Sequence, residues 1–535
     1  MNQSRETEFK VLITTSGIGS RLGEFTKFTN KSLVPIGDTP AITKIIESYP
    51  PGTKFVVTLG HYGDLVRQYL QLAHPDISVE FVEIENYDRA GSSLGLSMLS
   101  AREHLNCPFI FHASDTLVGN EEIHPPRTNW IAGFKGDDAS QYTSFDGAGG
   151  KLIQTHSKGM DRFDFIHIGL IGIKEYEKFW NFLEALYLQN PADASLNDLR
   201  VVAKMLENGS EFKIFEYLRW SDVGSIRGLQ KARSEGSHDL ASLEKVDEAI
   251  FRVDNKIIKF FSNNEICEGR VKRALILSQS VPKVIASTRN FYSYEFVAGD
   301  VMSNHTDRES FEKLLHWASD RYWHAPFEAV DDSVFESTCR DFYFEKSKNR
   351  IAAFFAKSGF EDSEGKINGL EVPTADVMLR QLDARQEFIG KQGLMHGDFI
   401  LDNLLQTGDS YTALDWRQDF GGLLGVGDIY YDLAKLNHSL TMNHEILNSA
   451  KFRLDINSAG VSIDILRYDS FVTCAAILKD FVQSQGLDYR RVEILTGIIW
   501  LNMSALHPHP LDLFLFHYGK FQLWRAIQQD LSEQG

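Results

Sequence analysis

Two separate stretches of the sequence carry small and charged residues at spacings that suit phosphate chemistry. In the first, Leu12–Gly37, an apolar run leads into glycines and hydroxyl side chains and then two cations, Arg21 and Lys31. Glycines let backbone N–H groups approach phosphate oxygens, and cations neutralise them. The candidate nucleotide-binding residues of this stretch are Ser16, Gly17, Gly19 and Ser20. A glycine pair after a strand is, by itself, more often a plain turn than a phosphate site.

The second stretch, Leu394–Leu405 (LMHGDFILDNLL), is followed by an apolar run that ends at Asp415. Phosphoryl transfer to a hydroxyl needs an aspartate near that hydroxyl and, five residues later, an asparagine on Mg²⁺. A further aspartate at the end of a nearby strand completes the metal site. Asp398, Asn403 and Asp415 have this arrangement. We therefore predict Asp398 as a catalytic carboxylate and Asn403 and Asp415 as metal ligands.

Apolar and amphipathic segments alternate around the first stretch. The predicted strands and helices are Phe9–Thr14, Ala41–Ser48, Lys54–Leu59, Leu65–Leu72, Ser78–Ile84 and Pro108–His112. This rhythm is typical of a parallel α/β sheet, which carries functional groups at the carboxyl ends of its strands. Asp115 lies just beyond one such end, so its position alone makes it a candidate site residue.

A polar segment, Ser234–Asp247 (SEGSHDLASLEKVD), follows the predicted helix Ile226–Arg233 and marks a domain boundary. We predict one domain over residues 1–235 and a second over residues 246–535. The second begins with two apolar runs around Asp254-Asn255, a pair that suits a hairpin turn, and long helical patterns dominate the rest.

Composition limits the partners and the location of the protein. The chain has 535 residues and a formal net charge of −18, which argues against a nucleic-acid binder that neutralises backbone phosphates. The cysteines lie far apart without a C-x-x-C pair, so neither a disulfide framework nor a zinc site is expected. No apolar run is long enough to span a membrane. We expect a cytoplasmic protein with small-molecule substrates and without membrane or nucleic-acid partners; homo-oligomerisation stays open.

The first stretch, LITTSGIGSRLGEFTKFTNKSLVPIG, resembles the signature of the sugar-phosphate nucleotidyltransferases: a strand, G-x-G-[TS]-R-L, then K-x-L-x-P-[IV]-G. It departs from that pattern at Thr15 and Ser16, where the family usually has Ala and Gly, and at 23–25, where the family often has Pro-Leu. Arg21 and Lys31 match. The resemblance extends to about residue 235 and implies that these two cations act on the leaving pyrophosphate.

The same resemblance implies metal ligands and a third cation. Asp115 in FIFHASD and Asp222 in WSDVGS match the two aspartates that hold Mg²⁺ in the family, and hard oxygen ligands suit that ion. Either aspartate alone is more often a helix cap or turn residue. Lys158 precedes the apolar segment Ile168–Ile173, as does the family lysine that holds the attacking phosphate. The usual Glu-Lys-Pro is absent, so a plain surface lysine is an equal alternative.

The second stretch continues with L-D-W at 414–416 and G-D-x-x-x-D-L-A at 427–434, and the whole pattern resembles the aminoglycoside phosphotransferase and choline kinase superfamily. The resemblance runs from about residue 246 to the end. It implies that Lys259 contacts ATP phosphates, with Glu268 as its ion-pair partner and Glu265 as an alternative. Lys259 would otherwise be an exposed edge-strand lysine. The sequence departs from the pattern in having no glycine-rich loop before Ala249.

Together the two resemblances imply an α/β chain: a Rossmann-like nucleotidyltransferase domain with a mostly parallel sheet, then a bilobal kinase-like α+β domain. They imply a bifunctional enzyme that uses Mg²⁺ and ATP to phosphorylate a small hydroxyl metabolite. The product would then be coupled to a second nucleoside triphosphate, CTP, UTP, GTP or dTTP, with release of pyrophosphate. We expect a precursor for surface polysaccharide or capsule, a nucleotide sugar being one possibility and an activated amino alcohol the other.

Two alternatives remain open at this stage. Trp317, Trp323 and Trp416 would suit a cage for a quaternary ammonium such as choline, although buried tryptophans more often pack a core. The kinase-like domain would, in the rival interpretation, be a non-catalytic regulator of a cytidylyltransferase for a phosphocholine-like substrate.

Overall fold

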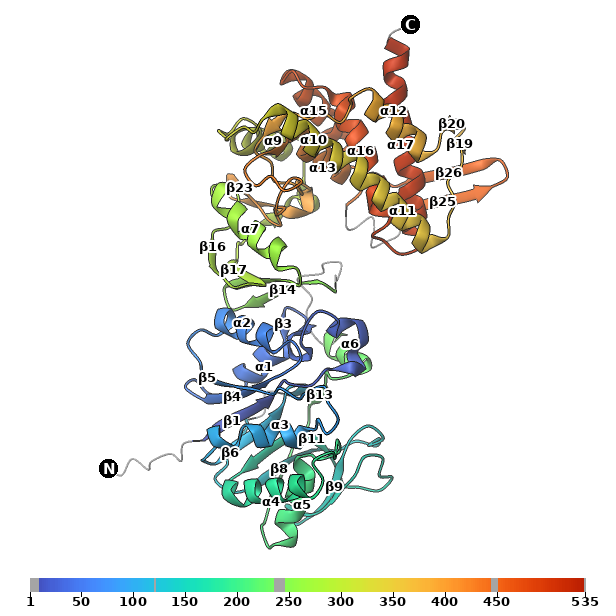
Figure 1. The fold of residues 1–535 in the computed structure, drawn as a ribbon. Helices are drawn as coiled ribbons and strands as arrows, with labels where there is room; N and C mark the ends of the chain where they lie inside the picture. Colours follow the sequence, from blue (N-terminus) through green and yellow to red (C-terminus); the bar gives the residue numbers. More distant parts are fainter. Residues whose placement is uncertain (1–8, 120–121, 235–245, 444–450, 534–535) are drawn as a thin grey trace. The chain divides into compact units, whose positions relative to one another are not determined.

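A computed structural model describes residues 9–119, 122–234, 246–443 and 451–533 of the chain (Figure 1). These residues form two compact units. Unit 1 comprises Met1–Cys267 and Ile285–Phe296, and unit 2 comprises Glu268–Val284 and Val297–Gly535. Each unit is described by itself below. No helix in the described ranges is long and apolar enough to cross a membrane.

Unit 1 is built on a nine-stranded sheet with the order β5-β4-β1-β6-β11-β8-β12-β10-β9. The strands are β1 (Lys10–Thr14), β4 (Lys54–Leu59), β5 (Ser78–Glu83), β6 (Phe109–Ala113), β8 (Trp130–Phe134), β9 (Ser144–Ala148), β10 (Lys151–His156), β11 (Phe165–Ile173) and β12 (Lys213–Glu216). β5, β4, β1 and β6 are mutually parallel, and β11 runs antiparallel to β6 and β8. The predicted α/β fold with a largely parallel half is confirmed.

Both faces of this sheet are buried, which explains the unbroken apolar runs of its central strands. Val11 and Ile13 of β1 belong to one hydrophobic cluster, and Leu12 between them belongs to another on the opposite face. The covering helices include α1 (Ala41–Glu47), α2 (Gly63–Ala73), α3 (Leu94–Ser100), α4 (Tyr176–Gln189) and α5 (Asp198–Glu207). Because β1 and β6 are parallel neighbours, with Thr14 opposite Ala113, the loops that follow them lie at one edge of the sheet.

A second sheet of unit 1 contains the predicted hairpin, β14 (Glu248–Val253) and β15 (Lys256–Phe261), joined to β17 (Phe291–Glu295). It packs on α2. The ring of Tyr69 lies 5.1 Å from the ring of Phe251, and Gln68 Oε1 accepts a hydrogen bond of 2.8 Å from the backbone N–H of Asn290. Residues 246–267 are therefore compact with the first 234 residues. The predicted domains, residues 1–235 and 246–535, were drawn from the extent of the two sequence patterns, and this division stays a prediction.

Unit 2 is mostly helical, as expected for the larger lobe of a kinase-like domain (Figure 1). Its main helices are α9 (Arg308–Ala318), α11 (Lys346–Ser358), α13 (Ile429–Ser439), α15 (Asp469–Ser484), α16 (Tyr489–Ser504) and α17 (Leu511–Glu533). Most of α16 is buried, which accounts for its nearly continuous apolar sequence. A small sheet contains β18 (Asp300–Val301), β22 (Leu404–Thr407) and β23 (Ser410–Ala413). β22 and β23 follow the H-G-D segment, and Asp415 comes directly after them.

Candidate active sites

The loop after β1 is open to solvent and anchored at its start. Ser16 is buried, and its Oγ lies 2.8 Å from the Oγ of Ser97, whereas Gly17 and Ser20 are exposed. Gly19 has φ +71°, and a Cβ there would lie 2.9 Å from the Cβ of Lys31. Only glycine allows this backbone conformation and approach together. The loop can therefore pass close to Lys31 while Gly17 and Ser20 stay accessible.

Asp115 and Asp222 are brought together by a two-stranded pairing. Asp115 lies between β6 and β7 (Thr116–Val118), and Asp222 ends β13 (Trp220–Asp222). β7 and β13 pair antiparallel with Asp222 opposite Thr116, and the backbone N–H of Val223 donates to the carbonyl oxygen of Asp115 at 2.9 Å. The short strands thus place side by side two carboxylates that are distant in the sequence.

The two predicted cations contact these carboxylates. Lys31 Nζ lies 3.0 Å from Asp115 Oδ2. Arg21 reaches both, with Nη2 at 3.8 Å from Asp115 Oδ2 and Nη1 at 4.0 Å from Asp222 Oδ2. The four residues predicted from the sequence therefore form one cluster, and half of the Arg21 side chain remains exposed to a ligand.

The pKa values of the two carboxyl groups are shifted in opposite directions. Burial acts to raise the pKa of Asp115, but the charges of Lys31 and Arg21 outweigh it, and the pKa is lowered. Burial and the charge of Asp115 raise the pKa of Asp222. Tyr142 Oη donates to Asp222 Oδ2 at 3.0 Å, and the N–H of Gly224 donates to Asp222 Oδ1 at 2.9 Å; both favour the ionised form. No sequence pattern pointed to Tyr142, which reaches the site from the segment before β9.

The donor set of this cluster fits a hard cation. The raised pKa of Asp222 shows that a second negative charge at this place is unfavourable without a compensating cation. Among the described residues there is no group of three or more His, Cys, Asp and Glu side chains placed to hold a metal. Oxygens from a ligand and water would therefore have to complete the coordination shell around Asp115 and Asp222, as is usual for Mg²⁺ with nucleotide phosphates.

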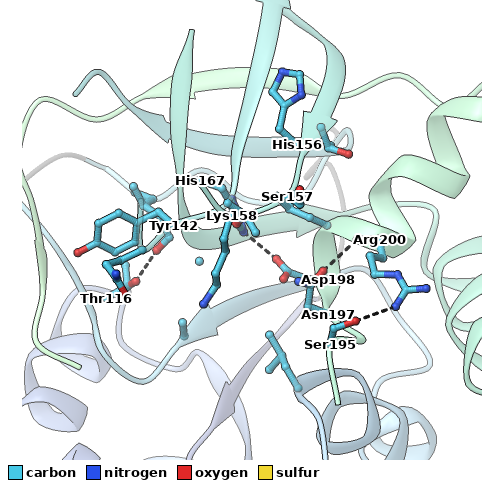
Figure 2. A pocket seen from close by; sticks show the side chains of 18 of the residues that line it. Thr116, Tyr142, His156, Ser157, Lys158, His167, Ser195, Asn197, Asp198 and Arg200 are labelled. Atoms are coloured by element: carbon cyan, nitrogen blue, oxygen red, sulfur yellow. Dashed lines mark hydrogen bonds and ion pairs between the residues drawn. The ribbon is translucent and has the colours of Figure 1, made fainter. Parts of the chain in front are cut away.

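A cavity of about 780 Å³ opens beside the cluster (Figure 2). Arg21, Asp115 and Asp222 form part of its wall, and Lys158 extends into it from the exposed turn after β10. Lys158 therefore faces the same space as the predicted cations and carboxylates. This placement favours the binding role of Lys158 over that of a plain surface lysine.

The wall of the cavity also contains a buried hydrogen-bonded pair that the sequence did not suggest. His167 Nε2 lies 2.7 Å from Asp198 Oδ2, and both side chains are almost fully buried (Figure 2). Asp198 is the first residue of α5, so the helix N-terminus also favours its negative charge. His167 Nδ1 has no partner among the described residues. His167 lies on β11, directly before the apolar segment Ile168–Ile173. Nothing in the sequence pattern around this histidine predicted a role for it.

In unit 2, Asp398, Asn403 and Asp415 are also brought together. Asn403 Nδ2 donates to the carbonyl oxygen of Asp398 at 2.9 Å and to its Oδ2 at 3.3 Å. The N–H of Leu414 donates to the carbonyl oxygen of Asn403 at 2.7 Å, which fixes Asp415 next to them. Asp415 has φ +59°, a strained conformation for a residue other than glycine. Such strain is common where a side chain must be aimed at a ligand.

Two cations that the sequence did not single out neutralise this site. Lys435 Nζ from α13 lies 2.8 Å from Asp398 Oδ1, and Arg270 Nη1 from α7 (Asn264–Ile276) lies 3.4 Å from Asp415 Oδ1. Burial acts to raise the pKa of Asp398, but Lys435 and, more weakly, His396 and Arg270 outweigh it and lower the pKa well below its ordinary value. Asp398 is therefore ionised at neutral pH.

The G-D-x-x-x-D-L-A motif braces the loop that carries Asp398. Asp432 is fully buried and accepts hydrogen bonds from the N–H groups of His396 at 2.6 Å and Gly397 at 2.7 Å. Burial raises the pKa of Asp432 to about 6 although both N–H groups oppose the shift. Asp428, also fully buried, accepts from the N–H of Lys391 at 2.9 Å. The two aspartates therefore hold backbone in place rather than facing a substrate.

The structure does not test the predicted ion pair between Lys259 and Glu268. Lys259 lies on β15 of unit 1 and is only 3 % exposed, so it is not an exposed edge lysine. Glu268 belongs to unit 2, is exposed, and pairs with Lys272 one helical turn away at 2.6 Å. Their predicted ion pair, and their role with ATP, stay predictions.

The three tryptophans considered for an ammonium cage are packed against other groups. Trp416 is fully buried, and its Nε1 donates to the carbonyl oxygen of Arg270 at 2.7 Å. Trp323 packs on the ring of Phe399 at 5.8 Å, and Trp317 packs on Tyr411 at 5.7 Å. These contacts favour core packing over a cage.

A known protein family matches the part of the chain that carries the second candidate site. The family model described as "Phosphotransferase enzyme family" matches residues 359–456, which include the H-G-D-x-x-x-x-N and G-D-x-x-x-D-L-A segments. This part of the chain is therefore phosphotransferase-like. A search of curated proteins found no match to the sequence.

The search of solved structures found chains that each match less than half of this chain at low identity. One, described as a glucose-1-phosphate thymidylyltransferase from Bacillus anthracis, is 19% identical to this chain and has a TM-score of 0.37. The match covers 44% of this chain and 98% of the solved chain. The CTP:phosphocholine cytidylyltransferase from Streptococcus pneumoniae is 17% identical, covers 43% and 99%, and also has a TM-score of 0.37. A UDP-glucose pyrophosphorylase complexed with UDP-glucose is 16% identical, covers 42% and 97%, and has a TM-score of 0.35.

Proposed function

We propose that the chain is a bifunctional enzyme: an ATP-dependent kinase for a small hydroxyl metabolite, and a nucleotidyltransferase that couples the phosphorylated product to a second nucleoside triphosphate. The observation that carries the proposal is that each of the two predicted sets of acidic residues converges within its own unit. Asp115 and Asp222 meet beside a cavity, and Asp398, Asn403 and Asp415 meet on a braced loop. The phosphotransferase-family match supports the kinase activity.

In the nucleotidyl transfer, a phosphate oxygen of the acceptor attacks the α-phosphorus of the triphosphate, and the bond to pyrophosphate breaks. The attacking group is already an anion, so positioning and charge neutralisation replace a general base. We assign the attacking phosphate to Lys158, which lines the cavity. We assign the leaving pyrophosphate to Arg21 and Lys31, which contact Asp115, and the triphosphate to the backbone N–H groups of the exposed loop 17–20.

In the kinase reaction, the acceptor hydroxyl attacks the γ-phosphorus of ATP and its proton passes to Asp398. Lys435 keeps Asp398 ionised, and Asn403 holds the Asp398 carboxylate by a hydrogen bond. When bound, Mg²⁺ held by Asn403 and Asp415 here, and by Asp115 and Asp222 in unit 1, would neutralise charge on phosphate oxygens.

The two reactions form an ordered sequence in which the product of the kinase is the substrate of the transferase. Its product would serve as a precursor of surface polysaccharide or capsule, made in the cytoplasm where nucleoside triphosphates are available. The rival function is a nucleotidyltransferase regulated by a non-catalytic kinase-like domain. The intact set of Asp398, Asn403, Asp415 and Lys435 favours a catalytic domain over this rival.

The proposal is tested by measuring pyrophosphate and ADP release from the full chain. Reactions contain Mg²⁺, ATP and one of CTP, UTP, GTP and dTTP, with a panel of free and phosphorylated sugars, polyols and amino alcohols. We expect one phosphorylated acceptor to release pyrophosphate without ATP, and its free form to do so only with ATP. Pyrophosphate release from phosphorylated acceptors without ADP formation from any free acceptor would support the regulatory alternative.

A further inference from the structure

Four basic side chains gather next to Asp398 in unit 2. Lys346 and Arg350 lie four residues apart on α11 and therefore share one face of that helix, Arg417 follows β23, and Lys435 lies on α13. All four are partly buried. They stand out in a chain with a formal net charge of −18. None of Lys346, Arg350 and Arg417 was assigned a role above.

Two aromatic rings hold this cluster together. The ring of Phe342 has Lys346 Nζ at 3.9 Å and Arg417 Cζ at 5.1 Å from its centroid. It packs edge-on against Tyr431 at 5.0 Å, and Lys435 Nζ lies 6.0 Å from the centroid of the Tyr431 ring. Lys435 in turn contacts Asp398. Lys346, Arg417 and Lys435 therefore form one continuous group that ends at the proposed catalytic carboxylate.

The positive charge of this group is not balanced by neighbouring carboxylates. Lys435 pairs with Asp398, but Lys346, Arg350 and Arg417 form no ion pair within 4 Å with a carboxylate of the described ranges. Arg417 Nε donates to the backbone carbonyl of Asp419, and no described group accepts from its two terminal nitrogens. By contrast Arg273, which is fully buried, donates to the carbonyl oxygens of Met395, His396, Arg417 and Leu424 and has a structural role.

The cations destabilise one another. Burial, and then the charges of Arg417, Arg350 and Lys435, lower the pKa of Lys346 to about 6, and Asp419 opposes this only in part. An anion bound among them would relieve the repulsion and restore the charge of Lys346. A solvated surface cluster would not show this effect, because water screens exposed charges.

We propose that the alcohol phosphorylated at Asp398 carries an oxyanion, a carboxylate or a phosphate, that binds to Arg417, Lys346 and Arg350. This rests on the proposed kinase activity. Lys435 then lies between the oxyanion site and the reacting hydroxyl. The hydroxyl oxygen forms the new bond to the γ-phosphorus, the bond to ADP breaks, and the proton goes to Asp398. The kinase product carries two anionic groups, of which the new phosphate is the one that reacts in unit 1.

The same cluster disfavours a quaternary ammonium acceptor, because the site would repel a cation. Recognition of such a cation needs open aromatic faces or carboxylates. Trp323 and Trp416 are buried, Trp317 packs on Tyr411, and Asp398 is already paired with Lys435. A planar guanidinium such as Arg417 instead suits bidentate binding of a carboxylate or phosphate.

The test compares acceptors that share a carbon skeleton and differ in charge. ADP release by the full chain is measured with glycerol, glycerate and glycerol phosphate, with glucose, gluconate and glucose 6-phosphate, and with choline. We expect kcat/KM to be at least about tenfold higher for an anionic member than for the neutral member of its series, with choline unused. The carboxylate and phosphate arms tell the two oxyanions apart. Equal or better turnover of neutral or cationic acceptors would overturn the proposal.

Variants locate the site. K346M and R417Q should each raise KM for the anionic acceptor about tenfold or more and leave KM for ATP within about twofold; R350Q provides a second variant on α11 if K346M does not fold. K348M is the matched control, because Lys348 lies on the same helix but pairs with Glu345. A rise in KM for ATP instead would assign the cluster to nucleotide phosphates and refute the proposal.

Calorimetry with inorganic phosphate and with glycerate separates this proposal from the proposed function. Binding to the wild type that is weakened in K346M and R417Q, without any ADP release, would keep the oxyanion site and refute the kinase activity. ADP release from an acceptor with no such binding would keep the kinase and refute the oxyanion site.

Discussion

The two candidate sites differ in how their carboxylates are neutralised. In unit 1, Asp115 and Asp222 repel one another, and the pKa of one is lowered while that of the other is raised. Their cations, Lys31 and Arg21, lie beside an open cavity. In unit 2, Asp398 has its own partly buried lysine, Lys435, and its pKa is lowered.

This difference matches the chemistry proposed for each site. Nucleotidyl transfer needs no proton acceptor, so the carboxylates of unit 1 serve as metal ligands. They need not both be ionised until a cation binds. Phosphoryl transfer from ATP to a hydroxyl releases a proton, so Asp398 must be ionised and aimed before the substrate arrives. The buried Asp432 fixes the backbone of that loop, whereas the β7–β13 pairing fixes Asp115 and Asp222.

The largest expected effect separates the two sites completely. In Asp398→Asn, kinase turnover should fall by about 10²- to 10⁴-fold, because the proton acceptor is lost. Pyrophosphate release from an already phosphorylated acceptor should not change. Both rates are measured on one preparation, with Asp409→Asn in the exposed turn between β22 and β23 as the control. Unchanged kinase turnover would instead show that the kinase-like domain is a regulator.

The reverse separation comes from the cation of unit 1. Lys31→Met should lower pyrophosphate release from a phosphorylated acceptor by about 10²- to 10³-fold, because charge on the leaving group is no longer neutralised. ADP release by unit 2 should stay as in the wild type. Lys27→Met is the control, since Lys27 is exposed and pairs only with Glu24 among described carboxylates. Equal loss in both variants would contradict the role of Lys31.

The buried His167–Asp198 pair tests whether the cavity of unit 1 has a brace comparable with Asp432 in unit 2. His167→Leu should reduce the free energy of unfolding of unit 1 by about 1–3 kcal/mol, because Asp198 loses its buried partner. Denaturant unfolding followed by signals from unit 1 measures this change. His156→Leu is the comparison, and a smaller loss is expected because its partner Asp146 is much more exposed. Equal losses of stability in the two variants would mean that the His167–Asp198 pair contributes no more than an exposed pair does.

The smallest effect concerns the proton affinity of Asp222. Burial and Asp115 raise its pKa, and the hydrogen bond from Tyr142 opposes that rise. Tyr142→Phe removes the opposing contact, so Asp222 becomes harder to ionise. The acid limb of the pH profile of pyrophosphate release should then move to higher pH, by less than about one unit. Tyr187→Phe on α4 is the control. A shift to lower pH, or none, would show that Asp222 does not set that limb.

The sequence by itself determined the fold class and several of the strands and helices, and it predicted the acidic residues that the two candidate sites contain. The strand Lys54–Leu59 and the hairpin at Asp254-Asn255 lie where local pattern placed them, because apolar periodicity and turn residues act over a few neighbours. Asp115 and Asp398 were found because motif spacing is local as well. The structure brings Asp115 close to Asp222, and Asp398 close to Asn403, but the roles of these residues stay predictions.

Only the tertiary structure decided which charges meet. Lys435 and Arg270 reach Asp398 and Asp415 from helices far along the chain, and Tyr142 reaches Asp222 from a segment with no motif. Electrostatic pairing acts through space, so no sequence window contains it. The sequence did not predict the packing of β14, β15 and β17 on α2 for a similar reason. Which element an apolar strand packs against depends on the rest of the fold, not on the strand's own residues.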